Sequence, residues 1–437
     1  MHDEEPRSLR RLLNTGLRCL ACVAALSTLF AVRMSEARGD DVPAGTSVAP
    51  ETRGTLMIIG GFERVDNSKI WDEFLELCGG AGARIAVFPT ASDYPLRNGN
   101  DLVDHLNEMG ADAFLVPVGI KDFEKDYKDA VDDPKLIEQV KQAKGVFFIG
   151  GEQARIRDAL LTKAGGRTAM MEAIWNVYDQ GGVVAGSSAG AAIMSRIMYR
   201  EAEQVLATML HGVEWERETD LGLGFLPRDW FVDQHFLVRG RLGRALVAMH
   251  KHKIPYGVGI DEDTALVVEA NGNAHVVGYR GVVVMDISSV NTDEKIEGFN
   301  LKNVRLSYMG HGDLINMKTR EITPSQDKLD DRKVDANDPE FRPYFKGRLF
   351  YNDIIANTTL LDLMYKLIDN RYQEAVGLAF DGAAARVGST PGFEFRFRRE
   401  KDSIGWNTEI SGNDEYTILN LYLDIRPITI KGPLYDE

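Results

Sequence analysis

Short apolar runs alternate with segments of helical periodicity between residues 54 and 190. The runs begin at residues 55, 84, 113, 145 and 182 and read TLMIIGG, RIAVFPTAS, AFLVPV, GVFFIGG and GVVAGSS. The intervening segments that predict helices are 98–109, 133–144, 153–164 and 168–180. Alternation of this kind predicts an α/β fold, in which a mostly parallel sheet is flanked by helices.

The carboxyl ends of the predicted strands carry small and polar residues. They read IGG at residue 59, FPTAS at 88, IGG at 149 and AGSSAG at 185. Functional groups of open α/β sheets gather at this edge. Glycine pairs can also cradle phosphate, but the chain contains no Gly-x-x-x-x-Gly-Lys-Ser/Thr motif, so the sequence does not predict a P-loop nucleotide site.

The pattern becomes strand-like beyond Trp230, and Asn271 followed by Gly272 predicts a hairpin turn. Residues 323–343 are highly charged and predict a linker. The last part of the chain combines an apolar helix pattern with strand-like runs, at 353–368, 393–398 and 416–425. We therefore expect a main domain at 54–318 and a C-terminal α+β accessory region at 319–437, whose apolar faces must be buried.

The first 37 residues predict a secretory signal peptide. Arginines precede the apolar run Cys19–Val32, and Ser35 and Ala37 supply small residues for cleavage. The alternative is a membrane anchor, but the run is shorter than the roughly 20 apolar residues that span a bilayer. Residues 38–53 predict a polar linker, so we expect a secreted or periplasmic protein without a stable membrane span, exported by the Sec or the twin-arginine route.

Charge and cysteine content narrow the class of protein. The full chain carries a formal net charge of −15, and removal of the signal peptide leaves −16. An acidic chain of this kind is a poor nucleic-acid binder. Cys78 would be the only cysteine of the mature protein, so no intrachain disulfide is expected and packing must supply the stability.

Ser188 lies in the segment GGVVAGSSAGAAIMS, where Gly186, Ser188 and Gly190 match Gly-x-Ser-x-Gly. In that motif a serine occupies a sharp turn from strand to helix and exposes its hydroxyl, which favours a nucleophile. The alternative is a turn of small residues that lets a helix pack closely against a sheet. The five residues alone do not separate the two interpretations.

A serine nucleophile needs a base within hydrogen-bond reach and a third group that orients the base. The candidate bases outside the signal peptide are His105, His211, His235, His250, His252, His275 and His311. His235 is favoured because it follows Asp233 and precedes three arginines, although a structural histidine remains an alternative. Glu262 is the candidate orienting acid, with Asp261 and Asp263 as alternatives.

The three arginines after His235 suggest an anionic substrate, since guanidinium groups pair well with carboxylates. Helical spacing would place Arg241 and Arg244 on one face and Arg239 on another. They converge on one ligand only if the helix begins after about Gly240. The alternative is a set of surface arginines with scattered acidic partners.

Four motifs in this order resemble the cyanophycinase family of serine peptidases. They are GGEQ at 150–153, GSSAGA at 186–191, DQHFLVRGRLGR at 233–244 and GIDEDTA at 259–265. Enzymes of that family degrade cyanophycin, a poly-aspartate that carries arginine on each side chain. The resemblance covers about residues 54–318 and implies the class I glutamine amidotransferase-like fold shared with aspartyl dipeptidase. Ser187 stands where threonine is common, and residues 319–437 have no counterpart in the short intracellular members.

The resemblance implies a role for each site residue. Ser188 is the nucleophile, His235 its base and Glu262 the orienting acid. Ser, His, Glu is not the chain order of an ordinary lipase or esterase. Backbone groups of Gly151 and Ala189 would hold the oxyanion. The substrate pocket would comprise Gln153, Asp233, Gln234, Arg239, Arg241 and Arg244.

The implied reaction needs no metal or other cofactor. The implied substrate is cyanophycin or a smaller β-aspartyl peptide. The predicted signal peptide resembles that of the extracellular family members. An aspartyl or isoaspartyl dipeptidase and an inactive polymer-binding homologue remain alternatives. The sequence does not determine the oligomeric state, and a homodimer remains an alternative.

Overall fold

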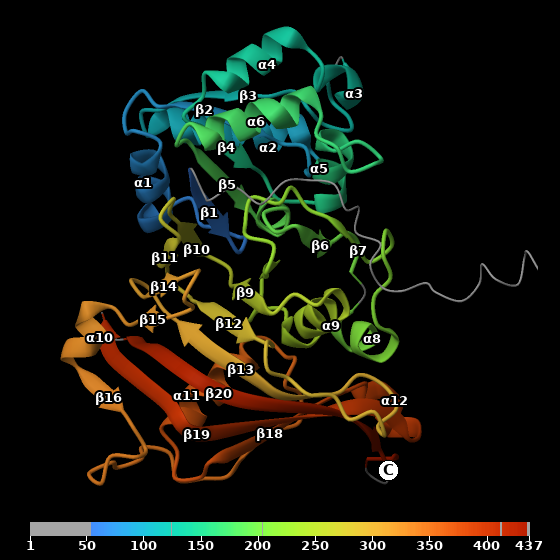
Figure 1. Cartoon of the computed structure of the whole chain (residues 1–437), viewed down its shortest axis with the longest axis vertical. Helices are drawn as coiled ribbons and strands as arrows, with labels where there is room; N and C mark the ends of the chain where they lie inside the picture. Colours follow the sequence, from blue (N-terminus) through green and yellow to red (C-terminus); the bar gives the residue numbers. More distant parts are fainter. Residues whose placement is uncertain (1–53, 124, 203, 411–412, 435–437) are drawn as a thin grey trace, which may run out of the picture. The chain divides into compact units, whose positions relative to one another are not determined.

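The computed structural model describes residues 54–434 except 124, 203 and 411–412. The predicted signal peptide at 1–37 and linker at 38–53 lie outside the described residues. The described part contains two nine-stranded sheets and one two-stranded sheet (Figure 1). Within the described ranges, we find no helix with the length and apolar character needed to cross a bilayer.

The first sheet contains all five strands predicted from the apolar runs. They pair in parallel, in the order β1 (Thr55–Ile59), β5 (Val183–Ser187), β4 (Gly145–Phe148), β2 (Arg84–Phe88) and β3 (Asp112–Leu115). Beyond β1 the sheet continues with antiparallel strands, in the order β10 (Thr264–Val268), β11 (Asn273–Gly278), β14 (Leu314–Asn316) and β15 (Ile322–Thr323). Asn271 and Gly272 lie in the turn between β10 and β11, so the predicted hairpin is confirmed.

Helices cover both faces of the first sheet, which confirms the α/β class. They are α1 (Ser68–Leu77), α2 (Pro95–Glu108), α3 (Tyr127–Ala130), α4 (Pro134–Lys141), α5 (Gln153–Leu160), α6 (Ala169–Asp179) and α7 (Ala189–Ala192). Alternate residues of β1 point to opposite faces: Leu56 shares an apolar cluster with residues of α4, α5 and α6, whereas Met57 shares one with residues of α1 and α2.

The second sheet combines strands from both sides of residue 318. Its order is β17 (Leu349–Tyr351), β18 (Glu374–Phe380), β19 (Thr390–Ile410), β20 (Asn413–Ile430), β13 (Leu301–Met309), β12 (Val282–Asp286), β9 (Tyr256–Ile260) and β8 (Trp230–Gln234), with β16 (Arg332–Val334) beside β19. The long β19 and β20 pair with each other, and β20 also pairs with β13 (Figure 1). The accessory region therefore extends a sheet that begins in the predicted main domain, while the division at residue 318 stays a prediction.

The other elements complete the described chain. The two-stranded sheet comprises β6 (Ile197–Tyr199) and β7 (Thr219–Leu221). The remaining helices are α8 (Val205–His211), α9 (Leu242–His252), α10 (Gln326–Asp330), α11 (Thr359–Ile368) and α12 (Gly382–Val387). Most aliphatic residues of the segments predicted at 353–368 and 416–425 are buried, including Leu363, Leu367, Leu421 and Leu423.

The prediction of a charged linker at 323–343 is wrong, because this segment contains α10 and β16. Lys328 of α10 is fully buried, and its ammonium lies 2.8 Å from the Asp313 carboxylate, which is also fully buried. Asp313 accepts further hydrogen bonds from the Gly310 N–H and the Thr417 hydroxyl. A charged residue can therefore be a core residue when its partner satisfies it, and sequence composition does not reveal that partner.

Candidate active site

The turn at Ser188 explains the Gly-x-Ser-x-Gly spacing. β5 ends at Ser187, Ser188 adopts φ 53° and ψ −105°, and α7 begins at Ala189. A Cβ on Gly186 would lie 2.3 Å from the carbonyl oxygen of Gly190, and one on Gly190 would lie 2.4 Å from that of Phe148. Only glycine fits at either position, so the small residues do allow close packing, as the alternative interpretation held. They also place Ser188 at a strained turn of the kind found at functional sites.

Three side chains from distant parts of the sequence form one line of contacts. The Ser188 Oγ lies 2.8 Å from the His235 Nε2, and the His235 Nδ1 lies 2.7 Å from the Glu262 Oε1. With the imidazole neutral, the carboxylate accepts the Nδ1–H, which leaves Nε2 free to accept the serine proton. The structure therefore brings the predicted nucleophile, base and acid together in the expected sequence of contacts.

The end of β1 holds the backbones that carry these side chains. The carbonyl of Ile59 accepts the N–H of Ser188 at 3.0 Å, and the carbonyl of Gly60 accepts the N–H of His235 at 2.9 Å. The carbonyl of Gly61 accepts the N–H of Asp263, the residue after Glu262, at 2.9 Å. Three consecutive backbone carbonyls thus fix the three segments that carry the nucleophile, the base and the acid.

Electrostatics keep the candidate base neutral. Burial, followed by the positive charges of Arg239 and Arg241, lowers the pKa of His235 to about 3. Burial and the negative charge of Asp261 raise the pKa of Glu262 above its ordinary value. The imidazole is therefore neutral over the physiological pH range. The neutral form is the one that can accept a proton from Ser188.

The two alternatives to Glu262 have other partners. The Asp261 Oδ1 accepts the N–H groups of Leu237 and Val238, each at 3.1 Å, and its Oδ2 lies 3.1 Å from the Arg280 guanidinium. The Asp263 Oδ1 accepts the N–H of Arg64 and the side-chain amide of Asn67. Glu262 is the acid of these three whose carboxylate contacts His235.

Four of the predicted pocket residues form a buried ionic network. The Arg244 guanidinium donates two hydrogen bonds to the Asp233 carboxylate, at 2.7 and 2.5 Å. The Arg241 guanidinium lies 3.4 Å from Asp233 and donates to the backbone carbonyl of Gln234 at 2.7 Å. Burial alone would raise the pKa of Asp233, but the two arginines outweigh burial and hold this pKa below its ordinary value. Loss of one partner from such a pair typically costs about 3–5 kcal/mol.

Gln153 joins this network through Tyr199, whereas Arg239 stands apart. The Gln153 amide donates to the carbonyl of Tyr199 at 2.9 Å, and the Arg244 guanidinium stacks 4.7 Å from the Tyr199 ring centroid. Arg239 is exposed and lines a cavity of about 520 Å³ between α8 and the C-terminal region. α9 begins at Leu242, after Gly240, yet the three arginines do not converge, because Arg244 points into the network and Arg239 to solvent.

The predicted oxyanion donors, Gly151 and Ala189, belong to two segments that meet at the serine turn. The N–H of Ser188 is already bonded to Ile59, so other N–H groups must serve. Ala189 is the first residue of α7, and a Cβ on Gly150, next to Gly151, would lie 3.1 Å from the Ser188 Cβ. These positions are compatible with the prediction that Gly151 and Ala189 donate to an oxyanion.

The loop after β1 contributes residues that sequence reasoning did not select. The Ser187 hydroxyl donates to the Glu63 carboxylate at 2.5 Å, and burial raises the pKa of Glu63. The ring of Phe62, which is 69% exposed, packs edge-on against His235 at 5.2 Å between centroids. The IGG signal at residue 59 marked this strand end, but nothing in the pattern distinguished the two residues that follow it.

Other titratable groups do not assemble a metal centre in the described part of the chain, where no cluster of three or more His, Cys, Asp or Glu could hold an ion. Cys78 is buried and unpaired, and burial raises its thiol pKa to about 12. A thiol with this pKa is not a nucleophile near neutral pH.

Comparison with known proteins places the site in a family context. Residues 56–276 match the model of peptidase family S51. The chain is 33% identical over 281 residues to a cyanophycinase of Geminocystis herdmanii, covering 62% of this chain and 96% of the relative. It is 31% identical to a cyanophycinase of Synechococcus elongatus, covering 62% and 81%. A solved peptidase from an acI-B1 actinobacterium is 20% identical with a TM-score of 0.45, covering 61% and 98%.

The charges around His235 predict how Ser188 reactivity depends on pH. The charge of Arg239 disfavours protonation of His235, so Arg239→Ala should raise the imidazole pKa and move the acid limb of Ser188 labelling by a fluorophosphonate to higher pH. In the parent, this limb should lie well below the 6.5 of an ordinary histidine. Arg342→Ala, at an exposed arginine of the C-terminal region, is the matched control and should not move it. An unchanged midpoint in Arg239→Ala would contradict the account.

Proposed function

This chain belongs to peptidase family S51, and from that premise we propose that it hydrolyses cyanophycin to β-aspartyl-arginine dipeptides. The family makes it a serine-type peptidase. The observation that carries the proposal is the line of contacts Ser188–His235–Glu262, in a chain whose curated relatives are cyanophycinases. Cyanophycin has a poly-aspartate backbone, so cleavage of each backbone amide releases one aspartate with its arginine attached.

The proposed reaction proceeds through an acyl-enzyme. The Ser188 Oγ attacks the carbonyl between successive aspartates while His235 Nε2 accepts its proton, and the N–H groups of Gly151 and Ala189 stabilise the oxyanion. His235 returns the proton to the leaving amine as the C–N bond breaks. Water then attacks the ester with His235 as base, which releases the acid and restores Ser188. Glu262 stabilises the imidazolium in both halves.

We propose that the predicted substrate-binding residues divide into two groups. Arg239 is exposed beside His235 and can meet a substrate carboxylate directly. The other five, Gln153, Asp233, Gln234, Arg241 and Arg244, are tied to one another or to Tyr199 and shape the wall that follows β8. Their polar groups are largely satisfied within the protein, which suits rigid positioning of the site rather than a change of partner on binding.

The N-terminal sequence supports a proposal that the protein acts outside the cytoplasm, on polymer released by other cells. Residues 1–37 combine arginines, an apolar run and small residues in the order of a signal peptide. The net charge of −16 after cleavage would keep the mature protein dispersed.

The substrate proposal is tested with the chain starting at Arg38. Incubation with cyanophycin should release β-aspartyl-arginine, identified by mass spectrometry, and Ser188→Ala should lower the rate by at least about 10⁴-fold. Rates on aspartyl and isoaspartyl dipeptides should be lower than on the polymer. Intact cyanophycin would refute the substrate; equal activity of Ser188→Ala would refute the nucleophile and favour an inactive homologue.

The location proposal is tested by expressing the full chain in a bacterium and sequencing the N-terminus of the exported material. Cleavage should leave a mature chain that begins near Arg38 in the periplasm or medium. A full-length chain that starts at Met1 and remains in the membrane fraction would support the anchor instead.

A further inference from the structure

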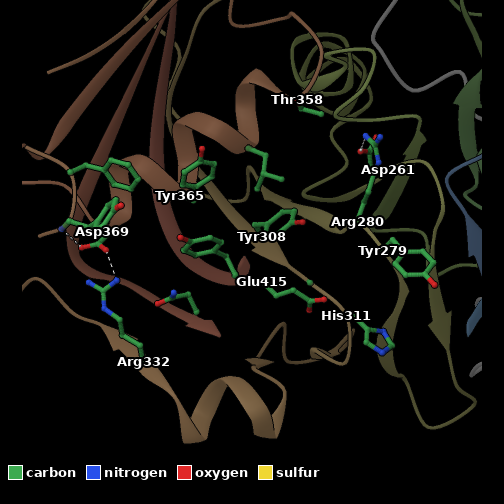
Figure 2. A pocket seen from close by; sticks show the side chains of 16 residues that line it. Asp261, Tyr279, Arg280, Tyr308, His311, Arg332, Thr358, Tyr365, Asp369 and Glu415 are labelled. Carbon is green, nitrogen blue, oxygen red and sulfur yellow. Dashed lines mark hydrogen bonds and ion pairs between the residues drawn. The ribbon is translucent and has the colours of Figure 1, made fainter. Parts of the chain in front are cut away.

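A cavity of about 820 Å³ lies between the second sheet and α11 (Figure 2). Of its lining residues, Asp261 alone falls inside the segment that matches the family model, 56–276. Its volume is within the range of small-molecule and peptide sites. Apart from Asp261, the cavity is thus built from parts of the chain that the family match does not include.

Aromatic rings form a continuous row along this cavity. Tyr344 contacts Phe345 at 5.0 Å between centroids, Phe345 contacts Tyr365 at 5.9 Å, and Tyr365 stacks on Tyr416 at 5.4 Å. All four line the cavity, and Tyr344 is 74% exposed. Aromatic faces attract planar cations, and guanidinium groups most of all, because the ring face carries negative charge.

Glu415 supplies a carboxylate oxygen that none of the described protein groups satisfies. Its Oε2 is buried and has no hydrogen-bond partner among the described residues. Burial raises the pKa of Glu415, as expected for a carboxylate that has lost water. Lys328, which lies nearby, is bonded to Asp313 at 2.8 Å. An unsatisfied buried oxygen costs free energy unless a ligand donates to it.

The other charges that line the cavity are matched in pairs. Arg280 lies 3.1 Å from Asp261, and Arg332 lies 2.7 Å from Asp369. Figure 2 shows these pairs on opposite sides of the cavity, with Glu415 and Tyr308 between them. Burial lowers the pKa of His311, which favours its neutral form. Among the charged residues that line the cavity, Glu415 is therefore the one whose carboxylate has an oxygen without a hydrogen-bond partner in the described part of the chain, while Lys328 and Lys69 act on it from outside the lining.

The cavity shares a wall with the catalytic segments. Asp261 directly precedes Glu262, and its carboxylate holds the N–H groups of Leu237 and Val238, just after His235. Thr358, another lining residue, donates its N–H to the carbonyl of Leu237 at 3.0 Å. A ligand in the cavity would therefore lie against the backbone that positions the base and the acid.

We propose that this cavity is a second binding site, which takes the arginyl guanidinium of a substrate or product peptide. The guanidinium would lie on the aromatic row and donate to Glu415, while peptide carboxylates would meet the outer edges of Arg280 and Arg332. The identity of the peptide rests on the proposed function, but recognition of the guanidinium rests on the cavity alone. Such a site would hold a neighbouring arginine of the polymer while Ser188 cleaves elsewhere.

The test uses the Ser188→Ala chain and calorimetric titration with β-aspartyl-arginine, L-arginine and aspartyl-aspartate. The two arginine-bearing probes should bind to the cavity, and addition of Glu415→Gln should weaken that binding about tenfold or more through loss of a charge-assisted hydrogen bond. Glu409→Gln, at an exposed glutamate on the adjacent strand β19, is the matched control and should change nothing. Tyr344→Ala, at an exposed ring, should also weaken binding and serves if Glu415→Gln does not fold.

The possible outcomes separate this proposal from the proposed function. Affinity for both arginine-bearing probes that is unchanged in Glu415→Gln and in Tyr344→Ala would overturn the site, even if the parent enzyme cleaves cyanophycin. Tighter binding of aspartyl-aspartate than of both arginine-bearing probes to the chain that retains Glu415 would also overturn it, since the cavity would then prefer anions. Arginine binding that depends on Glu415 would support the site, even if cyanophycin remained intact.

Discussion

Three backbone carbonyls at the end of β1 hold the active site together. Those of Ile59, Gly60 and Gly61 accept the N–H groups of Ser188, His235 and Asp263. The three accepted residues come from a turn of the first sheet, the end of a strand in the second sheet and the start of β10. Because one short segment fixes all three, the triad geometry depends on the position of this strand end rather than on the three loops separately.

This arrangement leaves no room for a side chain at position 61, where the residue is glycine. A Cβ on Gly61 would lie 2.3 Å from the Cε1 of His235, so the imidazole packs directly on the backbone. Ser188, His235 and Asp263 all have positive φ, at 53°, 48° and 54°. Strained backbone of this kind persists only where surrounding structure supports it. The paired strands β1 and β5 and the buried Asp233–Arg244 pair provide such support on either side.

Sequence pattern was sufficient for the five parallel strands and for four of the helices between them, because each has a local signature. The glycine spacing marked Ser188 as a candidate nucleophile but did not separate that role from a turn that only allows close packing. His235 and Glu262 had weaker signals. His235 was one of seven histidines outside the predicted signal peptide and Glu262 one of three adjacent acids. Their neighbours in the sequence made them candidates, and the family resemblance implied their roles. The contacts that distinguish Glu262 from Asp261 and Asp263 depend on how the segment leaves β9, which no local rule specifies.

The features that sequence missed are long-range. Glu63 bonds to Ser187 across more than a hundred residues, and buried Lys328 pairs with Asp313 inside a segment that composition marked as a linker. Likewise, β20 pairs with β13, but an apolar strand pattern does not indicate which strand it will pair with. Predicting this pairing requires knowing which edge strand of the sheet is unpaired.

The dependence on the end of β1 is tested most directly by Gly61→Ala, with Gly79→Ala as the control. Both glycines have similar positive φ, +111° and +107°, but a Cβ on Gly79 would meet nothing within 4 Å. If the account is right, Gly61→Ala should displace the His235 ring and slow fluorophosphonate labelling of Ser188 by about 10²-fold, whereas Gly79→Ala should label at the parental rate. Parental labelling of a folded Gly61→Ala chain would contradict it.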